Sequence, residues 1–376
     1  MIYLDNSATT ELAAEALEAM LPWLRGQYGN ASSVYDLGRR ARVAVEDARE
    51  EIAASIGAHP AELIFTSGGT ESDNAILKSA LEESALADVI AVGATEHHAV
   101  LLPAEALRRR GLEVQTLAVG SDGRIAPETA AAFNSRRTLL SVMHANNETG
   151  VIQPLRAIRA AAPDALLHTD AVQSFGKIPV KVGELGADFA SFSAHKIHGP
   201  KGVGAMFIRK GIDFKAHQQG GGQERNRRAG TEPVALIVGF QAAVRAAIIE
   251  MPQRVAHTAG LVAGMRRELL ARIPDIRINT PTEDALPVII NISFPDAARL
   301  DGEAILQSLD IRGIAASNGS ACVSGSMQPS HVLSAMGLPA DEARAAVRFS
   351  VSKFTTHAEA DEAVRTLADI IAAMRE

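Results

Sequence analysis

The middle of the chain alternates short apolar runs with stretches whose apolar residues recur at helical spacing. Seven runs between residues 62 and 210 have the length and composition of β-strands. Their sequences are "ELIFTS", "DVIAVGA", "EVQTLAV", "TLLSVMH", "ALLHTD", "ADFASFSA" and "GAMFIRK". Helical patterns such as "ESDNAILKSALEES" lie between several of them. This alternation predicts an α/β fold with a mostly parallel, seven-stranded sheet covered by helices.

The last third of the chain has a different pattern. Helix signals over residues 233–275 lead to the strand-like "PVIINISF", a helix, a second strand-like segment, "AAVRFSVSKF" and a final helix. This order predicts a smaller α+β domain, and a length of 376 residues suits two domains. We expect a large domain over residues 15–250 and a small domain formed by residues 1–14 and 251–376.

Composition narrows the class of protein. The net charge of -7 argues against nucleic-acid binding, which needs a basic face. The most apolar stretch contains Gln241 and Arg245, so no membrane span is expected. The first residues hold Asp5 and no basic segment, unlike a signal peptide. Cys322 is the only cysteine, which excludes an internal disulfide and favours the cytoplasm.

Polar residues follow several predicted strands, at the edge where ligands of open α/β sheets bind. "SGGTES" follows the first strand, and its glycines and the helix start after it are typical of a phosphate site. A plain helix cap is the alternative. Asp170 follows another strand and suits a metal, a ribose or a cationic ring nitrogen, unless it caps a helix.

Lysine and histidine follow two other strands. Lys196 lies next to His195, after one of these strands. A lysine that is partly desolvated at the ligand edge can attack a carbonyl group. The alternative is an ordinary surface lysine. His97 and His98 suit stacking on a flat ligand or acid–base catalysis, unless both are simply exposed at a helix start. A zinc site formed by His97, His98, His195 and His198 lacks the usual ligand spacing.

Together these residues indicate one ligand with three chemical groups. A phosphate suits "SGGTES", a cationic ring nitrogen suits Asp170, and an aldehyde suits Lys196. Pyridoxal phosphate carries all three groups. We therefore predict pyridoxal 5'-phosphate as the cofactor.

Nine motifs, in order along nearly the whole chain, carry a family resemblance. They are "YLDNSATT", "FTSGGTESDN", "TEHHAV", "MHANNETG", "HTDAVQSFGKIPV", "SFSAHKIHGPKG", "GGGQERNRRAGTE", "SNGSACVSGS" and "VRFSVSKFTT". The chain resembles the class V aminotransferase-like, fold-type I pyridoxal phosphate enzymes, and within them the cysteine desulfurases with a long cysteine loop. It departs from residues usual in that family at Ser7, Ala31, Tyr35, Ser352 and Lys353.

The resemblance implies which residues bind the cofactor. Lys196 would form a Schiff base with its aldehyde, Asp170 would pair with its ring nitrogen, and His97 would stack on its ring. The other contacts that the resemblance implies are Gly69, Thr70, Ser193 and His195 at the phosphate, Asn147 and Gln173 near the phenolic oxygen, and Thr231, which would reach the phosphate of the partner subunit in a homodimer.

The resemblance also implies the reaction, which removes sulfur from L-cysteine and releases L-alanine. Arg348 would bind the substrate carboxylate together with Asn147, and Lys196 and His97 would serve catalysis. Cys322 would take the sulfur as a persulfide and pass it to an acceptor protein, for iron–sulfur cluster assembly or thiolation. Glycine and serine around Cys322 are typical of a mobile loop, and an inert loop thiol is the alternative.

Three other functions stay open at this point. A selenocysteine lyase or an aminotransferase uses the same scaffold, because one fold hosts many reactions. Transamination has no use for a mobile thiol such as that of Cys322. A binding partner with little turnover is a third possibility, and alanine release from L-cysteine would exclude it.

Overall fold

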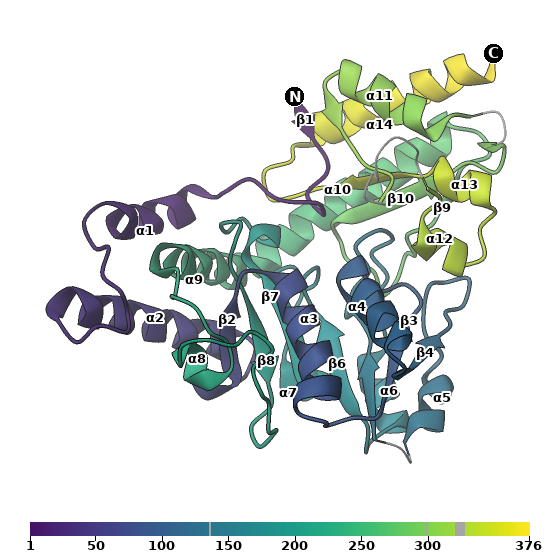
Figure 1. The fold of residues 1–376 in the computed structure, drawn as a ribbon. Helices are drawn as coiled ribbons and strands as arrows, with labels where there is room; N and C mark the ends of the chain where they lie inside the picture. Colours follow the sequence, from purple (N-terminus) through teal and green to yellow (C-terminus); the bar gives the residue numbers. More distant parts are fainter. Residues whose placement is uncertain (135–136, 298–299, 320–327) are drawn as a thin grey trace.

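A seven-stranded sheet forms the centre of the larger part of the protein in a computed structural model, which describes residues 1–134, 137–297, 300–319 and 328–376 (Figure 1). The strands lie in the order β2, β8, β7, β6, β5, β3, β4. Only β8 runs opposite to the others, so the sheet is mostly parallel, as predicted. The bounds of the strands are β2 (Leu63–Thr66), β3 (Val89–Gly93), β4 (Glu113–Leu117), β5 (Thr138–Ser141), β6 (Leu166–Asp170), β7 (Phe189–Ser193) and β8 (Gly204–Ile208).

Helices cover both faces of this sheet, which explains why its strands are continuous apolar runs. All residues of β3, β7 and β8 are buried. Alternate residues enter different cores: Phe65 and Phe207 pack in one cluster, whereas Ile64 and Met206 pack in another. A strand buried on both sides favours apolar residues at successive positions, which suits the central strands, whereas the edge strand β4 has three exposed residues, Glu113, Gln115 and Thr116.

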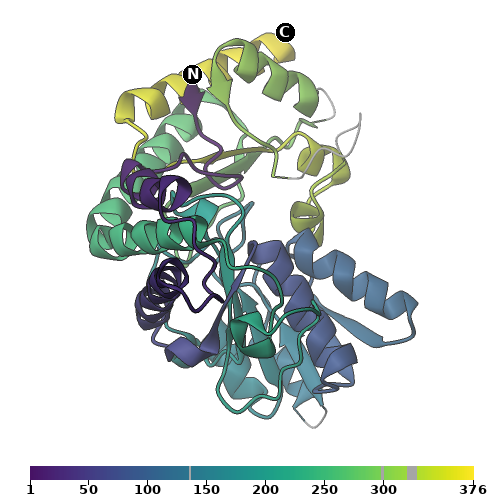
Figure 2. The same cartoon turned by 60° about the vertical axis from the view of Figure 1, so that its left-hand side comes forward.

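Fourteen helices, counted within the described residues, surround the sheets. The longer helices are α1 (Ala14–Arg25), α2 (Asp36–Ser55), α3 (Gly69–Lys78), α4 (His98–Arg109), α6 (Leu155–Ala161), α9 (Val234–Ile249), α10 (Met251–Arg272), α11 (Gly302–Ile311) and α14 (His357–Arg375). The shorter helices are α5 (Pro127–Ala130), α7 (Val182–Leu185), α8 (Gln223–Asn226), α12 (His331–Ala335) and α13 (Ala340–Arg344). Helices α1 and α2 project from one side of the sheet, next to α9 (Figures 1 and 2).

The C-terminal part is an α+β unit, as predicted. Strand β10 (Ile289–Ser293) lies between β12 (Val347–Ser350) and β9 (Arg277–Ile278) in an antiparallel sheet. The N-terminal strand β1 (Ile2–Tyr3) joins this part by pairing with β11 (Ile314–Ala315). Strands of two residues carry no readable periodicity, so the sequence did not predict β1 or β9.

Two large core clusters draw on different parts of the chain. One contains apolar residues between positions 16 and 247, and the other contains Leu4, Ala145 and residues between positions 261 and 371. The boundary near residue 250, with residues 1–14 assigned to the small domain, stays our proposal. Among the described residues no single helix is long and apolar enough to cross a membrane; α9 and α10 meet that test only as a pair bent by 72°.

Candidate active site

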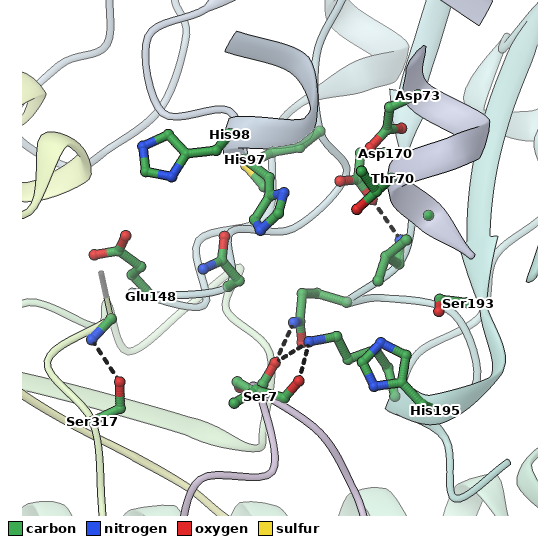
Figure 3. A pocket seen from close by; sticks show the side chains of 18 of the residues that line it. Ser7, Thr70, Asp73, His97, His98, Glu148, Asp170, Ser193, His195 and Ser317 are labelled. Atoms are coloured by element: carbon green, nitrogen blue, oxygen red, sulfur yellow. Dashed lines mark hydrogen bonds between the residues drawn. The ribbon is translucent and has the colours of Figure 1, made fainter. Parts of the chain in front are cut away.

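A cavity of about 370 Å³ lies at the carboxyl ends of the parallel strands (Figure 3). The predicted site residues that line it are Gly69, Thr70, His97, Asn147, Asp170, Gln173, Ser193, His195, Lys196 and Arg348. Thr231 is exposed and lies outside the lining, and Cys322 falls outside the described residues. In Figure 3, Asp170 and Ser193 face Glu148 and Ser317 across the cavity.

The start of α3 provides a site for an anion. Gly68 precedes the helix with φ at 153°, a conformation that favours glycine, and none of the described side chains caps the first turn. Gly69 and Thr70 line the cavity. A Cβ atom on Gly69 would lie 2.6 Å from Cγ2 of Val172, so only glycine lets the helix approach this closely. Free N–H groups and the helix dipole therefore face the cavity.

Asp170 places a buried carboxylate at the end of β6. Its Oδ1 accepts a hydrogen bond from the Val172 backbone N–H at 2.8 Å. Residues 172–177 form turns, so no helix begins here for Asp170 to cap. Burial, with a smaller contribution from nearby Asp73, raises the pKa of Asp170 to about 7. A cation in the cavity would restore the ionised form of this carboxylate.

Lys196 lies in a 3₁₀ turn directly after β7, with its amine at the cavity. Its Nζ donates to the backbone oxygens of Ser7 at 2.5 Å and Ala8 at 2.7 Å. Burial, followed by the charge of Arg348, lowers the pKa of Lys196 to about 8. The neutral amine, which is the nucleophilic form, is therefore accessible near neutral pH.

His97 precedes α4 and presents a neutral ring to the cavity. Its Nδ1 accepts a hydrogen bond from the Ala99 backbone N–H at 3.1 Å, which leaves the proton on Nε2. Burial and the charge of Lys196 lower the pKa of His97 to about 4. His98 also lines the cavity, with its ring centroid 4.8 Å from that of His331.

The other histidines considered as zinc ligands have separate partners. Nδ1 of His195 lies 3.1 Å from the hydroxyl of Thr9, and Nδ1 of His198 lies 3.0 Å from the carbonyl of Glu11. Among the described residues no group of three or more His, Cys, Asp or Glu side chains is arranged to hold a metal ion.

Arg348 enters the cavity from β12, on the C-terminal part of the chain. Its Nη1 donates to the Asn147 carbonyl at 2.9 Å, and its Nη2 donates to Oδ1 of Asp5 at 2.6 Å. The guanidinium is nearly fully buried. A forked cation held at two points is suited to bind a carboxylate.

Several residues line the cavity that sequence reasoning did not assign to it. Asp73 lies four residues after Gly69 on α3. Residues at this spacing lie on the same face of a helix, so the sequence could have indicated that Asp73 lines the cavity. Glu148 directly follows the predicted Asn147, and its Oε2 accepts from the Ser330 hydroxyl at 2.5 Å. His331 had no local signal, because only tertiary packing brings α12 to the cavity.

Comparisons with known proteins agree with this geometry. The sequence pattern of the family "Aminotransferase class-V" matches residues 2–362. The chain is 45% identical to "Cysteine desulfurase IscS" of Dictyoglomus turgidum, over 100% of this chain and 95% of that protein. Its fold matches a solved NifS-like protein with a TM-score of 0.90 and 37% identity, over 99% of both chains.

A further solved structure, SspA in complex with cysteine, matches with a TM-score of 0.81 and 32% identity, over 95% of this chain and 100% of that one. This chain therefore belongs to the aminotransferase class-V family, and within it to the cysteine desulfurases. Enzymes of that family use pyridoxal phosphate.

Proposed function

We propose that this protein is a cysteine desulfurase that binds pyridoxal 5'-phosphate in the cavity and transfers the sulfur of L-cysteine to Cys322. The observation that carries this proposal is the meeting of three groups in one cavity: the uncapped start of α3, the buried Asp170 and the amine of Lys196. Each suits a different part of one cofactor, and the family is one of pyridoxal phosphate enzymes.

The donor set fits this cofactor. Gly69, Thr70, Ser193 and His195 would hold its phosphate, and Asp170 would pair with its ring nitrogen. Asn147 and Gln173 would lie near its phenolic oxygen, and the neutral ring of His97 would stack on it.

The chain's own residues would perform the remaining steps. Bound pyridoxal phosphate supplies an electron sink for the α-carbon of the substrate. Arg348 and Asn147 would bind the carboxylate of cysteine, which orients the α-carbon toward Lys196. The neutral amine of Lys196 would take the α-proton at Nζ. His97 would hold the ring of the cofactor by stacking on it and would itself remain uncharged.

Sulfur transfer would then occur at Cys322. Its thiolate attacks the sulfur of the bound cysteine, and a sulfur–sulfur bond forms as the carbon–sulfur bond breaks. The electron pair passes to the substrate carbon, which is protonated and leaves as alanine. The outer sulfur of the persulfide would then be passed to an acceptor protein, in iron–sulfur cluster assembly or thiolation, which returns Cys322 to its thiol form.

The proposal includes a homodimer in the cytoplasm. Exposed apolar side chains occur along α1, α2 and their connection. They are Leu17, Leu24, Tyr28, Val34, Tyr35 and Val43. Both helices project from one side of the sheet (Figure 2). Thr231 is exposed, which leaves it accessible to a cofactor bound in a partner subunit.

One experiment tests the reaction. The purified protein and a Cys322→Ala variant are incubated with L-cysteine without reductant, and intact mass and alanine are measured. We expect alanine together with one added sulfur on the wild-type protein and none on the variant. Alanine without the adduct would contradict the role of Cys322. Neither product, from protein that binds the cofactor, would contradict the desulfurase and favour an aminotransferase or a selenocysteine lyase.

A further inference from the structure

Two lysines of the site are joined through one amide side chain and one backbone carbonyl. Nζ of Lys177 donates to Oε1 of Gln173 at 2.8 Å. Nε2 of Gln173 donates to the Ser7 carbonyl at 2.9 Å, and Nζ of Lys196 donates to the same carbonyl at 2.5 Å. Gln173, Ser7 and Lys196 line the cavity, whereas Lys177 lies behind it.

Lys177 occupies an unfavourable position for a charge. Burial, with the charges of Lys196 and Arg348, lowers the pKa of Lys177 to about 7. It lines a small second cavity whose other titratable groups are Lys196, His198, Arg254 and Lys353. No carboxylate among the described residues lines that cavity, so an ion pair does not explain why a lysine is present here.

The two neighbours of Gln173 determine which end of its amide faces which way. The oxygen and nitrogen of an amide are nearly the same size, so hydrogen-bond partners alone set the orientation. A protonated lysine amine only donates and therefore requires Oε1. The Ser7 carbonyl only accepts and therefore requires Nε2. Both contacts select the same orientation, with the –NH₂ group on the side of Ser7.

We propose that Lys177 is a positioning residue, whose amine holds the Gln173 oxygen and so turns the Gln173 –NH₂ group to donate to an oxyanion bound in the cavity. This inference rests on the proposed function, in which Gln173 lies near the phenolic oxygen of the cofactor. The second Nε2 hydrogen is the one available for that oxygen. A reversed amide would instead present a lone pair to it and destabilise the anion.

The test uses Lys177→Met, which removes the donor and keeps an unbranched side chain. Wild-type and variant proteins are loaded with pyridoxal 5'-phosphate, and the visible absorption of the bound cofactor is titrated against pH without cysteine. We expect the apparent pKa of the absorption change to rise by about one unit in the variant, because the Gln173 –NH₂ group that donates to the anionic oxygen is then held only by the Ser7 carbonyl and donates less well. We also expect cofactor affinity to fall about tenfold.

Matched variants separate positioning from a general effect. Lys181→Met makes the same substitution at an exposed lysine four residues away and should leave the titration unchanged. Lys177→Arg keeps a donor and should restore most of the wild-type value. In a Gln173→Ala background, Lys177→Met should add no further shift, because the amide through which it acts is gone.

The outcomes are distinguishable. Identical titrations of wild type and Lys177→Met, both with cofactor bound, would overturn this inference alone. A full additional shift from Lys177→Met in the Gln173→Ala background would overturn it as well, because Lys177 would then act directly. A wild-type protein that binds no cofactor would overturn both this inference and the proposed function.

Discussion

Asp170 and Lys196 have pKa values that burial moves toward each other. The pKa of Asp170 rises to about 7 and that of Lys196 falls to about 8, chiefly because both side chains are withdrawn from water. A cation near Asp170 would therefore be stabilised by the carboxylate that it helps to ionise. Lys196 loses its proton at a small cost in free energy near neutral pH. At the scale of single residues, the site depends on these two desolvated groups.

Asp170→Asn should weaken binding of pyridoxal 5'-phosphate by about 10- to 100-fold, because a charge-assisted contact is replaced by a neutral one. Titration of cofactor-free protein with the cofactor, followed by absorbance, measures this loss. Asp164→Asn is the control, since Asp164 is exposed and precedes β6. Equal affinities for the two variants would contradict the role proposed for Asp170.

His144 makes stability depend on pH in a predictable direction. Burial lowers the pKa of His144 from its ordinary value of 6.5 to about 4, so the unfolded state binds the proton first as pH falls. This residue therefore favours unfolding increasingly from pH 6.5 down to pH 4. When the pH is lowered from 7 to 5, the free energy of unfolding should fall in both proteins, and the fall should be about 2 kcal/mol smaller in His144→Asn than in wild type. Urea unfolding at both pH values measures this, and parallel losses would contradict it.

At the scale of elements, close packing of backbone places the start of α3. A Cβ atom on Gly204 of β8 would lie 2.6 Å from Cα of Gly68 and would also collide with the Phe192 carbonyl. Backbone cannot yield as a flexible side chain does, so the loop before α3 would have to move.

Gly204→Ala should therefore reduce the free energy of unfolding by about 1–3 kcal/mol and weaken cofactor binding. Gly183→Ala is the matched control, because a Cβ atom there meets nothing within 4 Å. Its effect should stay within about 0.5 kcal/mol. Urea unfolding and cofactor titration of both variants test the prediction, and an unchanged Gly204→Ala protein would refute it.

A buried ion pair holds the short helix α8 against α2. Arg49 donates to both carboxylate oxygens of Glu224, at 2.7 and 2.8 Å, and both side chains are buried. Glu224, Arg225 and Asn226 all have positive φ, which is costly for residues other than glycine. The pair therefore stabilises a strained segment that leads to Thr231.

Glu224→Ala should reduce the free energy of unfolding by about 3–5 kcal/mol, because it leaves the Arg49 charge buried without its main partner. Glu46→Ala removes the second, partly exposed carboxylate beside Arg49 and should cost at most about 1 kcal/mol. Denaturant unfolding compares the two variants. Equal losses would show that the buried pair is not the contact that matters.

At the scale of the whole molecule, the exposed apolar residues of α1, α2 and their connection form the surface that we propose is covered in the homodimer. Val34, in that connection, is 86% exposed. Val34→Glu should shift the proposed dimer toward monomer, as measured by sedimentation velocity over a concentration series. Ile311→Glu, at an equally exposed residue on α11, should leave the oligomeric state unchanged. A monomeric wild-type protein would contradict the homodimer.

The sequence by itself determined the seven-stranded sheet and the residues at its ligand edge. The central strands are local, mostly apolar runs. Asp170 ends β6 and Lys196 lies three residues after β7, so patterns over short distances in the sequence indicate both the strands and these residues. The family motifs located Asn147, Gln173 and Arg348 in advance, and all three line the cavity. Their roles stay predictions.

Only the tertiary structure decided which distant segments complete the site. The Ser7 and Ala8 carbonyls meet Lys196, Asp5 meets Arg348, and β1 pairs with β11, although the partners in each of these contacts lie at least 188 positions apart in the sequence. The orientation of the Gln173 amide is likewise decided by contacts on both sides of it. Such contacts have no periodicity along the chain, because they arise from the packing of separately formed elements.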